Sequence, residues 1–226
     1  MSETPALFGV GTPRGRREIA PGAVHLPGWL TPDRQADLVS ACRAWARGPV
    51  PIRHTQLPRG GVMSVQTVCL GWHWQPYRYS RTADDVNGAH VAAFPDWLTA
   101  LGRRAYADAY QDPDGAAGYT PDAALINYYR ADARLGMHQD KDERSDAPVV
   151  SLSLGDTCLF RLGNTVNRNR PWTDVELASG DLLVFGGPSR LAHHGVPKVY
   201  PGTGDPSIGL TEGRLNITLR VTGLAG

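Results

Sequence analysis

Short apolar segments separated by Gly, Pro and Asn follow one another after Pro121, and this pattern constrains the fold more than any other feature of the sequence. Segments of this length, rich in Val, Ile, Leu and Thr and bounded by turn residues, are typical of β-strands. We predict strands over residues 123–129, 149–154, 157–162, 174–178, 182–185, 191–196 and 215–221. Many short strands at this spacing favour a sandwich or jelly roll. The loop predicted over residues 197–213 is long enough to suggest a functional lid.

The first half of the chain predicts supporting elements. Thr31-Pro32-Asp33 combines an N-cap residue with a proline in the first turn, apolar residues follow at helical spacing, and Gly48 ends this helix. A second helix is predicted over about residues 96–110. Residues 1–22 show no apolar periodicity, which predicts a loose N-terminal arm. The expected fold class is therefore mainly β with flanking helices.

Composition places the chain among globular proteins. A chain of 226 residues, 41% hydrophobic and 20% charged, can bury one full core, so we predict a single domain over residues 1–226 and a monomer. No run approaches the roughly 18 consecutive apolar residues of a membrane helix, and the N-terminus lacks the order of a signal peptide. We therefore expect a cytoplasmic protein without membrane contact. The widely spaced Cys42, Cys69 and Cys158 predict buried small hydrophobic residues and no disulfide framework or zinc site.

Charge is distributed unevenly along the chain. The net charge is +1, but residues 1–81 hold 10 Arg against 4 Asp and Glu, a difference of +6, which leaves −5 for residues 82–226. A positive first part suits contact with phosphate groups. An arginine-rich surface without a nucleic-acid partner would look the same, so the charge leaves both interpretations open.

One arrangement of residues suits a metal: His138-Gln139-Asp140 with a distant histidine at His194. Two imidazoles and one carboxylate can occupy one face of a non-haem iron(II) and leave the remaining positions free for ligands. A His-x-Asp pair arises by chance roughly 0.5 times in a chain of this composition, so its neighbours must support it. His193 competes with His194, since adjacent residues on a strand point to opposite faces and spacing does not choose between them.

The final predicted strand separates polar from apolar side chains. Period two places Arg214, Asn216, Thr218 and Arg220 on one face and Leu215, Ile217, Leu219 and Val221 on the other. A solvated strand face would show the same pattern. An inward-facing arginine would instead suit a dicarboxylate, because guanidinium and carboxylate pair through two parallel hydrogen bonds.

Several stretches occur in a recognisable order. They are Ala124 to Tyr129, His138 to Glu143, Ser151 to Gly155, Gly186 to Arg190 and Arg214 to Arg220, with shorter pieces at Met63 to Val65, Gly71-Trp72 and Tyr77 to Ser80. Together they resemble the AlkB-type alkylated nucleic-acid demethylases, which are iron(II)- and 2-oxoglutarate-dependent dioxygenases. The resemblance implies a double-stranded β-helix (jelly-roll) core over about residues 121–226 and a nucleotide-recognition lid over about residues 50–90.

The resemblance also implies roles for individual residues. Iron(II) would bind His138, Asp140 and His194, the histidine that precedes a glycine, with Arg220 beside Asp140 in the catalytic centre. The co-substrate 2-oxoglutarate would meet Arg214 at its distal carboxylate and Arg220 near the other. Further contacts to 2-oxoglutarate fall to Asn127, Tyr128, Tyr129, Asn216 and Thr218.

On the substrate side, the implied contacts come from the lid and from the edge of the site. They are Trp72, Tyr77, Arg78, Tyr79, Asp142 and, in the polar loop 164–170, Arg168. An alkylated adenine or cytosine ring carries positive charge, so aromatic faces and a carboxylate would favour it over the neutral base. Core packing is the alternative interpretation of the aromatic residues, above all of Trp72.

The implied reaction is oxidative demethylation of 1-methyladenine and 3-methylcytosine in DNA, with RNA as a second candidate. O2 and 2-oxoglutarate would be consumed, and succinate, carbon dioxide and formaldehyde would be released. Two alternatives stay open on the sequence alone. One is a 2-oxoglutarate-dependent hydroxylase of a small molecule or a protein side chain, and the other is a non-catalytic β-sandwich binding module.

Overall fold

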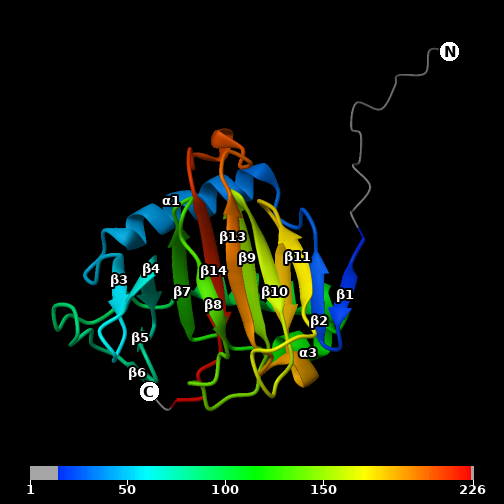
Figure 1. Cartoon of the computed structure of the whole chain (residues 1–226), viewed down its shortest axis with the longest axis horizontal. Coiled ribbons are helices and arrows are strands. Elements are labelled where there is room, and N and C mark those ends of the chain that lie inside the picture. The colour runs from blue at the N-terminus through cyan, green and yellow to red at the C-terminus, as the bar shows by residue number, and fades with distance from the viewer. Residues whose placement is uncertain (1–14, 225–226) are drawn as a thin grey trace.

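Two antiparallel sheets face each other and form the body of the molecule (Figure 1). The computed structural model describes residues 15–224. The larger sheet has the strand order β1-β2-β12-β9-β14-β7-β4-β3, and the smaller has the order β11-β10-β13-β8. Most neighbouring strands in both sheets come from distant parts of the chain, as in a jelly roll, although β1-β2, β3-β4 and β10-β11 are consecutive. The predicted fold class is confirmed.

The larger sheet consists of β1 (Arg17–Ala20), β2 (Ala23–Leu26), β3 (Arg53–Gln56), β4 (Val62–Leu70), β7 (Ala123–Tyr129), β9 (Val149–Gly155), β12 (Leu182–Phe185) and β14 (Arg214–Arg220). The smaller sheet consists of β8 (Leu135–His138), β10 (Thr157–Leu162), β11 (Thr173–Leu177) and β13 (His194–Tyr200). A two-stranded ribbon, β5 (His73–Gln75) and β6 (Arg78–Ser80), completes the strands.

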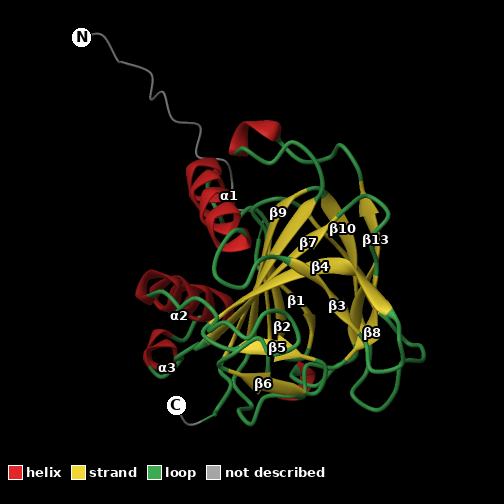
Figure 2. Ribbon diagram, turned by 90° about the vertical axis from the view of Figure 1, so that its left-hand side faces the viewer, coloured by secondary structure: helices red, strands yellow, loops and turns green. Residues whose placement is uncertain are grey.

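Helices cover the outer face of the larger sheet (Figure 2). The helix α1 (Pro32–Ala46) begins at Thr31, whose hydroxyl accepts a hydrogen bond from the Arg34 amide. The helix α2 (Asp96–Tyr110) has its predicted bounds, and the short α3 (Pro113–Ala117) follows it. Both predicted helices are therefore confirmed. No helix within residues 15–224 is long and apolar enough to cross a membrane.

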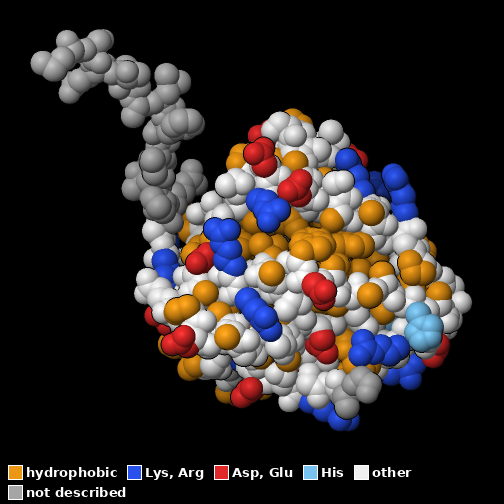
Figure 3. Space-filling model, turned by 180° about the vertical axis from the view of Figure 1, so that it is seen from behind, with side chains coloured by type: hydrophobic (Ala, Val, Ile, Leu, Met, Phe, Trp, Pro, Cys, Tyr) orange, Lys and Arg blue, Asp and Glu red, His pale blue; other side chains and the backbone are white. Residues whose placement is uncertain are grey.

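A groove of about 420 Å³ runs between α1 and α2, lined by Trp29, Leu38, Trp97 and Leu101 among others. Figure 3 shows hydrophobic side chains gathered on this helix-bearing face, with basic groups around them. The groove lies on the outside of the larger sheet, away from the space between the sheets.

The strand β14 divides an apolar core from a polar interior. Leu215, Ile217 and Leu219 belong to a buried cluster that also contains Leu98 of α2. The alternating residues, from Arg214 to Arg220, are buried as well, although they are polar. A solvated strand face is therefore excluded. Because β14 pairs with β7 on one side and β9 on the other, its polar side chains point into the middle of the sandwich.

Two predictions about loops were wrong. Residues 1–14 lie outside the described residues, but Arg17–Ala20, predicted as part of a loose arm, forms β1. It pairs with β2 across a turn in which Gly22 adopts φ 75°, a conformation open to glycine. Likewise, the predicted loop 197–213 begins only after Tyr200, because Pro197 lies at a register shift between β10 and β13 where the ladder does not need its missing N–H.

The loop after β13 does not serve as a lid over the polar interior. Ile208, in the short 3-10 helix η2 (Pro206–Ile208), is buried in the core, and the Arg43 guanidinium of α1 donates to the Gly209 carbonyl. Figure 1 shows this loop at the end of β14 where Arg214 lies. None of its residues lines the cavity described below.

Residues 50–90, where a lid is expected, are partly built into the larger sheet. The strand β4 pairs with β7, so residues 62–70 extend the larger sheet. The part that stands apart from the sheets is the ribbon β5-β6 with its flanking loops. As predicted, Cys42, Cys69 and Cys158 are buried free thiols, and burial raises the pKa of Cys42 to about 12.

Candidate metal centre and co-substrate pocket

Three side chains that suit a metal converge at one end of the sandwich. His138 ends β8 and His194 begins β13, and these two residues are paired across the two strands. Asp140 follows β8, and its Oδ1 and Oδ2 atoms lie 3.6 Å and 3.7 Å from Nε2 of His138 and of His194. One donor atom from each residue lies within 4.8 Å of the other two. The predicted triad is thus assembled by strand pairing.

Local hydrogen bonds orient the two imidazoles. Nδ1 of His138 contacts the Gly136 carbonyl at 2.9 Å, and Nδ1 of His194 contacts the Ala192 carbonyl at 3.0 Å. A carbonyl oxygen only accepts, so both Nδ1 atoms carry the proton and both Nε2 atoms keep a free lone pair. Fixing the tautomer in this way prepares a histidine for metal binding.

The structure decides between the adjacent histidines. Nδ1 of His193 bonds to the Asn164 carbonyl at 3.0 Å, on the opposite side of the strand from Asp140. His194 alone shares the cavity with His138 and Asp140. His193 instead fastens the loop between β10 and β11.

The charges around Asp140 keep the centre ready for a cation. Burial opposes its negative charge, but Arg220, with Nη2 at 2.7 Å, and the two histidines hold the pKa of this carboxyl well below its ordinary value. Burial, reinforced by His138, lowers the pKa of His194 to about 4. At neutral pH the site therefore presents an ionised carboxylate and a neutral imidazole, the forms that bind a metal.

Arg214 provides the second feature of the cavity. Its side chain is 1% exposed, and Nη2 donates to the Ser153 hydroxyl at 3.0 Å. Its Nε and Nη1 atoms have no hydrogen-bond partner within residues 15–224. A buried cation with unpaired donors is costly unless an anion completes it. The carboxylate of a dicarboxylic acid would do so, which fits 2-oxoglutarate.

The cavity extends from Arg214 to the three candidate metal ligands. Its lining includes Asn127, Tyr129, Asn216, Thr218 and Arg220, all predicted to contact the co-substrate. Their own hydrogen bonds hold them in place: Thr218 donates to Asn216 Oδ1 at 2.8 Å, and Asn216 donates to the Ser151 hydroxyl at 2.7 Å.

Tyr128 was misassigned as a co-substrate contact. It lies between Asn127 and Tyr129 on β7, so its ring points to the opposite face of the sheet and packs against the apolar cluster beneath the helices. Tyr128 does not line the cavity.

The predicted substrate residues fall into two groups. Tyr77, which adopts φ 74° and is 75% exposed, connects the strands of the ribbon, and Arg78 is exposed beside it. Trp72 fits the core-packing alternative: it is 7% exposed, its indole donates to Asp122 at 2.9 Å, and the Arg81 guanidinium covers its ring. Its ring is therefore enclosed by the protein.

Trp74, two residues further along the chain, contacts a predicted substrate residue. Its indole Nε1 donates to Asp142 Oδ2 at 2.8 Å, which joins β5 to the segment just after the metal-binding residues. Trp74 is partly exposed, and its bond to Asp142 connects it to a residue two positions along the chain from Asp140. Two tryptophans separated by one residue are indistinguishable by composition, and only the course of β5 selects the second.

The sequence interpretation also missed Glu143 and Arg190. The Glu143 side chain is fully buried and accepts from Arg220 at 2.9 Å and from Arg190 at 3.0 Å. Tyr79, predicted to contact substrate, donates to Glu143 instead. The His-x-Asp-x-x-Glu spacing could have drawn attention to Glu143, but nothing local signals a partner 47 residues away.

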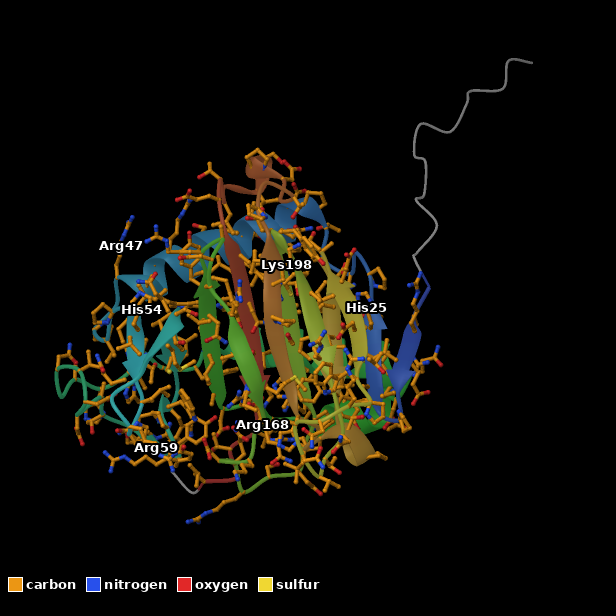
Figure 4. The ribbon with its side chains drawn as sticks, viewed as in Figure 1. His25, Arg47, His54, Arg59, Arg168 and Lys198 are labelled. Carbon is orange, nitrogen blue, oxygen red and sulfur yellow. The ribbon has the colours of Figure 1, made fainter. Side chains whose placement is uncertain are left out.

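Residues 163–172, here called the rim loop, border the centre on the side of β13. Gln139, between His138 and Asp140, donates to the Thr165 carbonyl at 3.0 Å and to the Leu191 carbonyl at 2.7 Å. Asn164 organises the loop by accepting from the amides of residues 166 and 167. Figure 4 shows Arg168 at the lower end of the strands, the end at which β14 reaches Arg220.

Comparisons with known proteins agree with this site. A family model described as the 2OG-Fe(II) oxygenase superfamily matches residues 22–220. The Alpha-ketoglutarate-dependent dioxygenase AlkB homolog of Caulobacter vibrioides is 38% identical over 211 residues, which cover 89% of this chain and 88% of that protein. The Alpha-ketoglutarate-dependent dioxygenase AlkB of Escherichia coli is 38% identical over 179 residues, covering 76% and 78%.

Longer relatives match as well. The DNA N(6)-methyladenine demethylase ALKBH1D of Arabidopsis thaliana is 33% identical over 221 residues, but these cover only 50% of that protein. The solved structure of OsALKBH1 matches with a TM-score of 0.81 and 32% identity, over 91% of this chain and 99% of that one. The chain thus spans half of the plant relative and most of the bacterial ones.

The fold, the His-Asp-His centre and the arginine-ended cavity define an iron(II)- and 2-oxoglutarate-dependent dioxygenase. The chain belongs to the 2OG-Fe(II) oxygenase superfamily and, within it, to the AlkB-type proteins. The non-catalytic binding module considered from sequence is thereby set aside.

Proposed function

We propose that the protein oxidatively demethylates N-alkylated bases, with 1-methyladenine and 3-methylcytosine in DNA as its substrates and the same bases in RNA as a second target. The observation that carries this proposal is one cavity that joins a His-Asp-His centre to an unpaired buried arginine, in a chain related to named nucleic-acid demethylases. The protein would act as a single dioxygenase domain and a monomer, in the cytoplasm.

Bound iron(II), with 2-oxoglutarate and O2, supplies the oxidising power that hydroxylates an N-methyl group, and the hydroxymethyl product then releases formaldehyde. His138, Asp140 and His194 would hold the metal. Arg214 would fix one end of the co-substrate, with Ser153 holding its guanidinium in the required plane. The neighbouring Arg220 keeps Asp140 ionised and oriented.

Recognition of the base is assigned to the ribbon side of the centre. The Trp74 ring can stack on a base, and the Asp142 carboxylate, hydrogen-bonded to that same indole, can favour a cationic ring over a neutral one. Tyr77 is exposed at the tip of the ribbon, where it can reach the neighbouring nucleotide. An alkylated base pairs poorly, which lowers the cost of extracting it from a duplex.

The rim loop suits the nucleic-acid backbone. It contains Arg168 and Arg170 and no acidic residue. The nearby Arg161 does not add to this positive charge, because its guanidinium donates two hydrogen bonds, each of 2.7 Å, to the Asp174 carboxylate. Arg170 lies over the Trp172 ring and near Asp174, whereas Arg168 makes no ion pair within residues 15–224 and can position a phosphate without reading sequence.

The test is formaldehyde release from oligonucleotides that carry 1-methyladenine, 3-methylcytosine or no lesion, in the presence of iron(II), ascorbate and 2-oxoglutarate. We expect release from both cationic lesions, with single strands at least as good as duplexes, and none with Asp140→Ala. Succinate formation without any formaldehyde would replace this function by hydroxylation of a small molecule or a protein side chain.

A further inference from the structure

A continuous chain of hydrogen bonds runs from the ribbon to the metal centre. The Tyr79 hydroxyl, on β6, donates to Glu143 Oε1 and accepts from Arg220 Nη1 at 2.9 Å. The same Arg220 Nη1 donates to Glu143 Oε1 at 2.9 Å, and its Nη2 binds Asp140 Oδ1 at 2.7 Å. The Arg220 side chain therefore links a ribbon tyrosine to a metal-binding carboxylate.

Buried charges make this chain stiff. The Glu143 side chain is fully buried and is held on its other oxygen by Arg190. Arg190 also donates to the Asp140 carbonyl and, at 2.8 Å, to the Ala147 carbonyl. Each buried charge has an opposite charge beside it, so moving one member exposes the others to a large penalty. Glu143 is thus fixed against the body of the protein.

The ribbon, by contrast, has little stability of its own. Two short antiparallel strands without a further sheet are marginal in water. Besides Tyr79, three contacts attach the ribbon. His73 Nε2 contacts Asp85 at 2.6 Å, and the Trp74 indole contacts Asp142. Arg53 of β3 contacts the His73 ring and donates to the Trp74 carbonyl at 3.1 Å. Of these attachments, the one through Tyr79 and Arg220 reaches a metal-binding atom directly.

We propose that Tyr79 and Glu143 are positioning residues that couple the closed position of the ribbon to the orientation of Asp140. When the ribbon is closed, the Tyr79 hydroxyl is hydrogen-bonded to both Glu143 and Arg220. Arg220 then holds Asp140 in the orientation that suits a metal. A metal on Asp140 fixes the same Arg220 and so favours the closed ribbon. The coupling is reciprocal, as any linkage between two binding events must be.

This inference rests on the proposed function only in its purpose, which is to link capture of the base to readiness of the centre. The coupling itself concerns the chain's own residues and can be measured without nucleic acid. Linked sites typically change each other's affinity by about 5- to 150-fold.

The test is amide hydrogen exchange of residues 73–80, with and without Mn(II) plus 2-oxoglutarate, which does not turn over. In the wild-type protein we expect metal to slow exchange of these amides by about fivefold or more. In Tyr79→Phe this metal-dependent difference should vanish, while the amides of β14 still respond to metal. A role in ribbon stability alone would speed exchange equally in both states and leave the difference intact.

Tyr110→Phe is the matched control, because it removes a hydroxyl that donates to the Gly22 carbonyl at 3.0 Å, far from the ribbon. It should retain the full metal-dependent difference. Glu143→Gln, which keeps the shape of the side chain but not its charge, should lose the difference as Tyr79→Phe does. The coupling is overturned if Mn(II) leaves the wild-type ribbon unprotected, or if Tyr79→Phe is protected to the same extent.

A second measurement separates this idea from the proposed function. In the wild-type protein, an oligonucleotide with 1-methyladenine should tighten Mn(II) binding, and Tyr79→Phe should abolish this effect. If ribbon protection depends on Tyr79 but no methylated oligonucleotide releases formaldehyde, the coupling stands and the nucleic-acid function fails. If formaldehyde is released but the ribbon is protected equally in both proteins, the nucleic-acid function stands and the coupling fails.

Discussion

The two sides of the candidate site are built in different ways. On one side, β14 pairs with β7 along its full length and with β9 from Arg214 to Leu219, and every residue of β14 is buried. On the other side, the ribbon and the rim loop are short and partly exposed, with Tyr77 at 75% and Val166 at 83% exposure. The first side holds Arg214, Asn216 and Thr218 in the middle of a sheet, and the second holds Trp74 and Arg168 on loops and a ribbon.

We infer that the rigid strand side serves the chemistry and that the less rigid ribbon side serves the choice of substrate. Groups that must meet a metal and a co-substrate with little error are best placed on rigid strands. Groups that admit a large and variable nucleic acid belong to the less stable parts of a fold. The two sides should therefore respond differently to substitution.

The largest effects are expected at the metal-binding residues. Asp140→Ala and His194→Ala should each abolish iron-dependent succinate formation, because the loss of one of three ligands removes both affinity and geometry. His193→Ala, which loses only its bond to the rim loop, should keep most of this activity. Loss in His193→Ala with retention in His194→Ala would reverse the assignment.

On the strand side, Arg214→Ala should weaken binding of 2-oxoglutarate at least a hundredfold. Removing one member of a buried ion pair costs about 3–5 kcal/mol, which exceeds two powers of ten in affinity. Ser153→Ala removes one hydrogen bond to the guanidinium and should cost only about tenfold. A calorimetric titration with Mn(II) present measures both. An unchanged curve for Arg214→Ala would place the co-substrate elsewhere.

On the ribbon side, Trp74→Ala should raise the KM for methylated oligonucleotide about 5- to 150-fold, the equivalent of about 1–3 kcal/mol of stacking. The requirement for 2-oxoglutarate should not change. Trp97→Ala is the control, a half-exposed tryptophan on α2. Trp72→Ala should mainly lower the free energy of unfolding, by about 3–5 kcal/mol. Equal KM values for Trp74→Ala and wild type would remove this residue from the site.

The smallest effect is expected at the rim loop. Arg168→Ala should weaken binding of all oligonucleotides alike and reduce the slope of log affinity against log salt by about 1, as for a single phosphate contact. Measurements with and without the lesion at several salt concentrations test this. A loss confined to methylated oligonucleotide would show that Arg168 contacts the base.

Sequence reasoning reached the strand side more fully than the ribbon side, for a physical reason. The strands β7, β10 and β12 have their predicted bounds, because turn residues and period-two alternation are local signals. The polar row of β14 was found in the same way. The strands β5 and β6 are three residues each and have no apolar face, so the sequence shows no period-two alternation that would predict them.

The sequence interpretation differed from the structure at single residues for two reasons: the face of the strand on which a side chain lies, and contacts between segments distant in the chain. Tyr128 shares its stretch with two cavity residues but points the other way, and Trp72 was preferred over Trp74 although only the latter contacts Asp142. The Glu143–Arg190 pair joins segments that are distant in the chain and carries no local signal. Such pairs become visible only when the sheets bring the segments together.

The middle residue of the His138-Gln139-Asp140 tripeptide is more than a spacer. Because the Gln139 amide donates to the carbonyls of Thr165 and Leu191, both the rim loop and the segment before β13 are anchored to the tripeptide that contains His138 and Asp140. A graft that replaces the rim loop with one of another length would therefore disturb the candidate metal centre unless a carbonyl kept the place of the Thr165 carbonyl. In any redesign of the substrate range, the rim loop and the tripeptide should therefore be exchanged together.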